Sequence, residues 1–270
     1  MNAAALPSVF LSHGSPMIAL EPGAAGEFMQ RLGPAIDAAF GRPRAIVAVS
    51  AHTTARSPVL LAAPRHEAVY DFGGFPDALF RLRYDAPGAP DLAAQVSGLL
   101  AAAGDEAITL AEGGLDHGIW TALRYVYPAA DVPVLPLALV PSMPPAQLFA
   151  LGEALAALRR DGVLVLGTGS ITHNLRLVFS NRRPAGPARH GADTAATDAD
   201  EMSECRAFRA WFAARSAARD WPALFDYRRQ APHAALMHPT DEHLLPWYPA
   251  AGAGGREAVP LRLHEGVTLG

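Results

Sequence analysis

The sequence of 270 residues contains no lysine, so all 22 of its basic residues are arginine. Two kinds of catalysis are thereby excluded, because Schiff-base enzymes and P-loop nucleotide-binding proteins both need a lysine side chain. Charge is also sparse: charged residues make up 18% of the chain, and the formal net charge is −4. This acidic balance gives no electrostatic case for binding nucleic acid.

Cysteine and long apolar runs are equally scarce. The single cysteine, Cys205, excludes an intramolecular disulfide and a thiolate metal cluster. It lies in the helical pattern of residues 201–212, which indicates a half-buried structural thiol. No apolar stretch reaches the ~18 residues that a membrane span needs, and the N-terminus lacks the basic region of a signal peptide. We therefore expect a cytoplasmic protein that does not contact a membrane.

Short apolar segments alternate with amphipathic ones along the chain. Strands are expected at 6–11, 45–51, 58–63, 79–84, 107–110, 133–140, 162–168 and 258–264, and helices at 25–40, 90–103, 118–127 and 144–160. This alternation predicts an α/β fold, a single domain over residues 1–270 with a mostly parallel central sheet flanked by helices on both faces. Residues 180–200 lack periodicity and are expected to form a long excursion within that domain rather than a linker.

Five histidines lie in small-residue turns of the kind where an α/β fold places its chemistry: His13, His52, His117, His173 and His243. The first, second and fourth of them follow apolar runs typical of buried parallel strands. Such sheets bind ligands at the carboxyl ends of their strands, and imidazole is the commonest protein ligand for metals such as zinc and iron. The pattern predicts that these histidines converge on one metal pocket, although for each alone a turn or surface role explains the residue about as well.

The residues themselves leave several roles open. His173 follows Gly-Thr-Gly-Ser-Ile-Thr and is interpreted as a further ligand or as a base. His117 begins a helix whose N-cap is expected to be Asp116; the macrodipole there disfavours an imidazolium, so we expect a neutral ring, or else a surface histidine near the cap. Glu242 is either a helix N-terminal carboxylate behind an N-cap at Thr240 or a metal ligand. Three other histidines have no comparable setting and are expected to be surface or satisfied residues: His66, His190 and His264.

Residues 70–76, Tyr-Asp-Phe-Gly-Gly-Phe-Pro, place two phenylalanines around a pair of glycines. The Asp-Phe-Gly triplet also occurs in protein kinases, but no other kinase motif accompanies it, so that match is due to chance. Phe72, Gly73 and Phe75 are interpreted instead as a flexible aromatic wall for a flat aromatic substrate. A core-lining loop explains the pattern nearly as well.

Six short motifs together resemble the class III extradiol ring-cleavage dioxygenases, in particular their DOPA 4,5-dioxygenase-like branch. In chain order they are Leu-Ser-His13-Gly-Ser-Pro-Met, Val-Ser-Ala-His52, Tyr-Asp-Phe-Gly-Gly-Phe-Pro76, Gly-Leu-Asp-His117-Gly-Ile-Trp, Ile-Thr-His173-Asn-Leu-Arg and Pro-Thr-Asp-Glu242-His243-Leu-Leu-Pro. They occur in the family's order from the start of the chain to about residue 246. Each motif is weak alone, and six in order are specific.

This resemblance implies a non-haem Fe(II) enzyme, or a zinc-loaded form of it, that opens a catechol such as DOPA with O2 to a muconic semialdehyde. By position, His13 and His52 match metal-binding histidines. His243 matches the third ligand of the DOPA-type branch, and the adjacent Glu242 leaves that assignment open. His173 matches a base for the second hydroxyl or an extra metal ligand, and His117 matches a contact to substrate or oxygen.

The implied partners are a small aromatic diol and O2, and the sequence is compatible with a homo-oligomer. Two other classes of protein also fit the residues. A zinc-dependent hydrolase would use a metal-bound hydroxide, with a histidine or Glu242 as base. A catalytically silent binding protein would keep the pocket without a redox metal. Consumption of O2 with a catechol after Fe(II) loading separates the first alternative from the dioxygenase, and tight catechol binding without turnover would favour the second.

Overall fold

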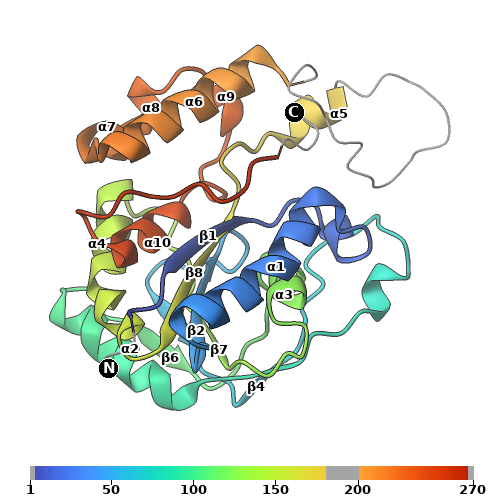
Figure 1. The fold of residues 1–270 in the computed structure, drawn as a ribbon, viewed down its shortest axis with the longest axis vertical. Coiled ribbons are helices and arrows are strands. Elements are labelled where there is room, and N and C mark those ends of the chain that lie inside the picture. The colour runs from blue at the N-terminus through green and yellow to red at the C-terminus, as the bar shows by residue number, and fades with distance from the viewer. Residues whose placement is uncertain (1–3, 181–200, 267–270) are drawn as a thin grey trace.

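The central sheet consists of four parallel strands in a computed structural model that describes residues 4–180 and 201–266 (Figure 1). Their order across the sheet is β1 (Ser8–Ser12), β8 (Val163–Gly169), β2 (Ala45–Ser50) and β7 (Val134–Pro136). Helices pack on both faces of this sheet. The predicted α/β class, with a mostly parallel sheet between helices, is confirmed.

Strand β2 shows how the two faces are covered. It is buried along its whole length, and successive side chains of a strand point to opposite faces. Ile46 and Ala48 pack with α1 (Gly23–Phe40) and α3 (His117–Val126) on one face. Val47 and Val49 belong to the buried cluster of the other face, to which α2 (Pro90–Ala102), α4 (Pro145–Leu155) and α10 (Trp247–Gly254) contribute. This cluster continues into the helices drawn above the sheet in Figure 1, which are α6 (Ser203–Ala218), α7 (Trp221–Phe225), α8 (Tyr227–Gln230) and α9 (Ala234–Met237).

Short elements complete the chain. The paired ones are β3 (Val59–Leu61) with β6 (Ile108–Leu110), which are parallel, and β4 (Arg65–His66) with β5 (Ala86–Pro87), which are antiparallel. The remaining helical ones are η1 (Pro16–Ala19), η2 (Leu79–Arg81), η3 (Ala156–Arg159) and α5 (Leu175–Ser180). None of the helices within the two described ranges is long and apolar enough to cross a membrane.

Two predicted strands are wrong. Residues 79–84 begin with the 3-10 helix η2, because the chain turns after Pro76 and the Leu79 amide donates to the Pro76 carbonyl. Residues 258–264 pair with no strand among the described residues. Their alternating apolar side chains have no sheet edge to pair with and stay exposed, and proline supplies no amide proton for a ladder: Val259, Pro260, Leu261 and Leu263.

Most of the predicted excursion, residues 181–200, lies outside the described residues. That residues 1–270 form a single domain stays a prediction.

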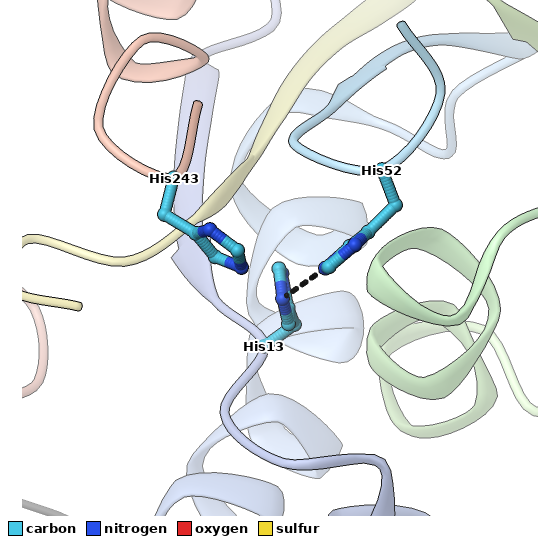
Figure 2. A group of neighbouring side chains, drawn as sticks. All are labelled: His13, His52 and His243. Atoms are coloured by element: carbon cyan, nitrogen blue, oxygen red, sulfur yellow. Dashed lines mark hydrogen bonds between the residues drawn. The ribbon is translucent and has the colours of Figure 1, made fainter. Parts of the chain in front are cut away.

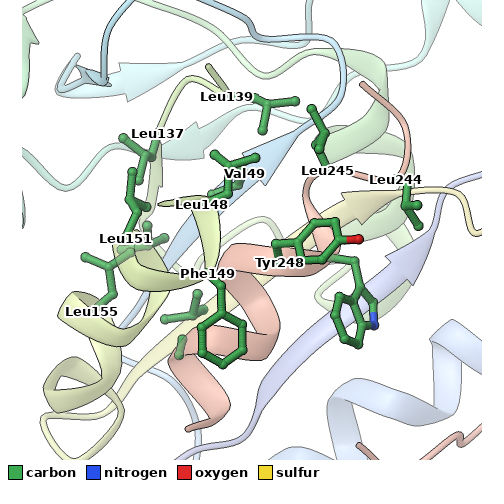
Figure 3. Packing of buried hydrophobic residues seen from close by; sticks show 14 of the residues in the cluster. Val49, Leu137, Leu139, Leu148, Phe149, Leu151, Leu155, Leu244, Leu245 and Tyr248 are labelled. Atoms are coloured by element: carbon green, nitrogen blue, oxygen red, sulfur yellow. The ribbon is translucent and has the colours of Figure 1, made fainter. Parts of the chain in front are cut away.

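The loop before α10 and the start of that helix are held in the core by three buried side chains, Leu244 and Leu245 in the loop and Tyr248 in α10 (Figure 3). Full burial of a leucine contributes roughly 1.5–3 kcal/mol, so this anchor is strong. The residue that precedes the two leucines, His243, is thereby fixed beside the carboxyl ends of the strands. Behind the anchor, α10 packs against α4 at backbone distance, since a Cβ on Gly152 would lie 2.1 Å from the Pro249 carbonyl oxygen.

We predict that Gly152→Ala destabilises the protein, by about 1–3 kcal/mol, because the added methyl group forces α4 away from α10. Gly98 is the matched control: it also lies inside a helix, and a Cβ there meets nothing within 4 Å. Gly98→Ala should therefore stabilise the protein by about 0.5–1 kcal/mol. Urea unfolding midpoints measure both, and a Gly152→Ala midpoint at or above the wild-type value would contradict the packing described here.

Candidate metal centre

Three histidines from distant segments meet at one edge of the sheet. His13 follows β1, His52 follows β2, and His243 lies in the loop before α10. Their rings point toward one another (Figure 2), and one ring nitrogen from each lies within 4.8 Å of the others. His13 and His243 are buried, with 2% and 6% of their surface exposed. The structure therefore brings together three of the predicted site residues.

The other two predicted histidines flank this group. The ring centroid of His117 lies 3.9 Å from that of His52 and 5.4 Å from that of His13. The ring of His173 stacks on that of His243, with 3.4 Å between centroids and 9° between planes. A ring nitrogen of His173 lies within 4.8 Å of ligand atoms of Glu242 and His243, and these three residues form a second group that could hold a metal ion. All five rings thus form one cluster, with His117 and His173 at its sides.

Hydrogen bonds fix which nitrogen of His13 carries the proton. The Thr168 hydroxyl, at the end of β8, donates to the Gly118 carbonyl at 2.8 Å. A hydroxyl has one proton, so Thr168 accepts from Nδ1–H of His13, 2.9 Å away. The Nε2 atom of His13 is then free of hydrogen and faces Nε2 of His52 at 3.1 Å.

His243 is oriented in a similar way by Glu242. The carboxylate can only accept, so Nδ1 of His243 donates to it at 3.2 Å and leaves Nε2 free. That hydrogen bond is the main reason that the pKa of Glu242 falls to about 2. Thr240 also donates to Glu242 at 2.9 Å, and residues 241–246 form turns instead of the expected helix capped by Thr240. Glu242 therefore lies behind His243 and holds it.

Three rings of the cluster, those of His13, His52 and His173, are neutral at neutral pH. Burial first, and the neighbouring histidines second, lower the pKa of His13 well below its usual value and that of His52 to about 3. The same two causes lower the pKa of His173 to about 4, against a smaller opposing effect of Glu242. Neutral imidazoles keep a lone pair, which is the form that binds a metal ion.

Asp116 ties the strand end that carries His52 to α3. Its carboxylate accepts from the hydroxyls of Ser50 and Thr53 at 2.7 and 2.5 Å, and from the Ile119 amide at 3.2 Å. The expected N-cap at Asp116 is therefore present. Its contacts with Ser50 and Thr53, on either side of His52, are an additional function that the sequence did not indicate.

The aromatic segment 70–76 lies next to His117. The ring of Phe72 meets that of His117 edge-on, with 5.5 Å between centroids, and Phe75 packs against Phe72 at 5.4 Å. Gly73 is exposed, and a Cβ there would meet nothing within 4 Å, so the wall is open at that point. Asp71, which received no role in the sequence reasoning, accepts hydrogen bonds from both the backbone and the ring of His117 at 3.0 Å.

Sequence reasoning missed two residues of the site and misplaced one histidine. Asp71 belongs to the triplet Asp-Phe-Gly, whose match to a kinase motif is due to chance, and it was given no other role. Thr168 lies between two glycines, which indicated only an open strand end. His66 is completely buried in β4, so of the two roles expected for it, a surface or a satisfied residue, the surface role is wrong. His264 is partly exposed and stacks on Phe28, and His190 lies outside the described residues.

The donor set fits a divalent transition metal. The nitrogens of His13, His52 and His243 converge, and the rings of His13 and His52 are neutral. Thr168 and Glu242 accept Nδ1–H from His13 and His243, respectively. Hydrogen bonding of the remote ring nitrogen is the usual outer support of a metal-bound histidine. The contact of 3.1 Å between Nε2 of His13 and Nε2 of His52 also needs something positive between two nitrogens, a proton or a metal ion.

Comparison with known proteins identifies relatives along nearly the whole chain. Residues 7–267 match the family model described as the catalytic LigB subunit of aromatic ring-opening dioxygenase. Proteins named 4,5-DOPA dioxygenase extradiol are similar: that of Beta vulgaris is 34% identical over 95% of this chain and 90% of its own, and that of Escherichia coli K12 is 35% identical over 100% and 93%. The crystal structure of an uncharacterized protein from Escherichia coli K12 superposes with a TM-score of 0.71, at 31% identity, over 92% of this chain and 88% of that one.

The positions of Glu242 and His243 predict opposite outcomes for their variants. His243→Ala should lose most bound metal, as should His13→Ala and His52→Ala, because each removes one of three converging nitrogens. Glu242→Gln keeps an oxygen that accepts from Nδ1–H of His243, so it should retain metal near the wild-type level. Elemental analysis after metal loading measures this, with circular dichroism to verify folding. Metal loss in Glu242→Gln but not in His243→Ala would show that the carboxylate is the third ligand.

Proposed function

The chain belongs to the family of the catalytic LigB subunit of aromatic ring-opening dioxygenases and is a ring-cleaving extradiol dioxygenase, and from this premise we propose its metal, its substrate and the roles of its residues. The metal is Fe(II), with Zn(II) able to load the same site, and the substrate is a small catechol such as DOPA, opened to a muconic semialdehyde. The observation that carries the proposal is the convergence of three imidazoles at the carboxyl edge of the sheet, two of which, His13 and His52, are kept neutral by burial.

His13, His52 and His243 hold the metal in this proposal. When bound, Fe(II) lowers the pKa of a coordinated hydroxyl and supplies the redox chemistry with O2, whereas Zn(II) supplies only the former. The three residues contribute no negative charge of their own, since Glu242 is directed at Nδ1 of His243. An all-imidazole set leaves the positive charge of the ion to attract an anionic catecholate.

His173 acts as the base for the second catechol hydroxyl. Its lowered pKa keeps the ring neutral, and a neutral ring can accept a proton. The stack on His243 holds it beside a proposed metal-binding residue. From the same position His173 would be a secondary ligand of the metal when no substrate is bound.

His117 and the aromatic wall bind the substrate. Nδ1 of His117 donates to Asp71, so its Nε2 is the nitrogen available to a substrate oxygen. Phe72 and Phe75 offer ring faces and edges on which a flat aromatic ring can pack, and Gly73 leaves space between them. Support for this assignment comes from the contact between Phe72 and His117, which sets the wall beside the cluster.

The test of this function is anaerobic loading with Fe(II) followed by a panel of small catechols that includes DOPA. We expect consumption of O2 together with a yellow ring-opened product, and no reaction from the zinc-loaded protein. His13→Ala serves as the folded control that lacks metal. Absence of O2 uptake with every catechol would overturn the proposal, and hydrolysis by the zinc form without O2 would favour the metal-dependent hydrolase instead.

His173→Ala separates the role of a base from that of a ligand. A base is needed only when the second hydroxyl loses its proton, so this variant should keep most of its metal and still bind catechol. Its ring-opening rate should fall by roughly 10²–10⁴-fold. Raising the pH should recover part of the rate, because solvent can then help to deprotonate the substrate. Purification of the variant without metal would show that His173 is mainly a ligand, and the base would have to be sought at His117.

A further inference from the structure

We infer that Asp71 is a positioning residue that fixes the tautomer and direction of His117 and joins the aromatic wall to the histidine cluster. The inference rests on the proposed function for the role of His117, but the contacts that carry it belong to the chain alone. One carboxylate oxygen, Oδ1, accepts from both the backbone amide and Nδ1–H of His117, each at 3.0 Å.

The two hydrogen bonds to one oxygen determine the state of the His117 ring. A carboxylate oxygen offers only lone pairs, so Nδ1 must carry the proton and Nε2 is the acceptor in the neutral ring. Without that partner, a neutral imidazole exchanges its proton between the two nitrogens, and Nε2–H could no longer accept from a substrate hydroxyl. Asp71 thus selects the form of His117 that the proposed substrate contact needs.

The second oxygen of Asp71 faces another part of the cluster. Its Oδ2 lies 3.9 Å from Nδ1 of His52, whereas Nε2 of that ring faces His13. A single carboxylate therefore lies against one proposed metal ligand and one proposed substrate contact. Asp71 directly precedes Phe72, whose ring meets that of His117 edge-on. The same short segment therefore positions both the aromatic wall and the ring of His117.

A purely structural role must be distinguished from this one. The His117 amide is at the first turn of α3, where backbone N–H groups lack helical partners, so Asp71 also caps that helix. Asp71→Asn retains an oxygen for the amide and for Nδ1–H, whereas Asp71→Ala retains neither. Asp77 is the matched control, an exposed carboxylate of the same loop for which the structure shows no partner among the described residues.

The first readout uses metal-free protein labelled with 15N at histidine, so it does not depend on activity. In the wild type and in Asp71→Asn, the ring nitrogens of His117 should show a single Nδ1–H tautomer. In Asp71→Ala they should show a mixture, with the peaks identified by their loss in His117→Ala. An unchanged tautomer in Asp71→Ala would overturn the inference, whether or not the wild type cleaves catechols.

The second readout uses the Fe(II) enzyme. Asp71→Ala should lose about 10–100-fold in kcat/KM, the usual effect of removing a partner that orients an active-site histidine, with both a higher KM and a lower kcat. Asp71→Asn should recover most of this loss, and Asp77→Ala should match the wild type. Metal content should stay at the wild-type level in all three variants, and its loss in Asp71→Ala would show that Asp71 is a ligand. An inactive wild type would count against the proposed function, and the tautomer measurement would still decide the role of Asp71.

Discussion

The position of the histidine cluster depends on the parallel register of β1, β8 and β2. Ser12 lies opposite Gly169, and Ser50 lies opposite Thr168, so the three strands end at the same edge of the sheet. β8 lies between β1 and β2, which are therefore about 10 Å apart, and the side chains of His13 and His52 reach across its end until their Nε2 atoms are 3.1 Å apart. The middle strand β8 supplies Thr168, which contacts His13 and the Gly118 carbonyl of α3. The buried sheet fixes the separation of the first two imidazoles, and the loop anchored by Leu244 and Leu245 brings the third.

Burial favours the neutral form of the imidazoles in this cluster. A proton on His13 or His52 would be poorly solvated and would be repelled by charge on the neighbouring histidines, so the pKa values of both rings are lowered. The two carboxylates nearest the cluster do not enter the group of three converging nitrogens. Glu242 and Asp71 instead accept Nδ1–H from His243 and His117. The two carboxylates thus orient the rings of His243 and His117 from outside the cluster. The converging nitrogens of His13, His52 and His243 are the atoms proposed to bind the metal ion.

Much of this arrangement could be predicted from the sequence. Strands β1, β2 and β8 read as apolar runs ending in small residues, and parallel strands place such ends together; hence His13 and His52 could be assigned to one site. Asp71 and Thr168 could not be found in this way, because a hydrogen bond between distant side chains depends on tertiary placement that no local pattern encodes. The strand predicted at 258–264 failed for a related reason: alternation of apolar residues favours a strand, but pairing needs a neighbouring sheet edge.

The close contact between β8 and the loop of His243 has an evolutionary consequence. A Cβ on Gly167 would lie 2.2 Å from the Pro246 carbonyl oxygen, and one on Gly169 would lie 2.0 Å from that of His243, whose carbonyl also accepts from the Ser170 amide. Main chain therefore rests directly on main chain, and the third imidazole takes its position from the backbone rather than from exchangeable side chains. Selection for a new substrate can accordingly substitute residues of the aromatic wall, 70–76, while the backbone that positions the proposed metal ligand His243 is inherited unchanged.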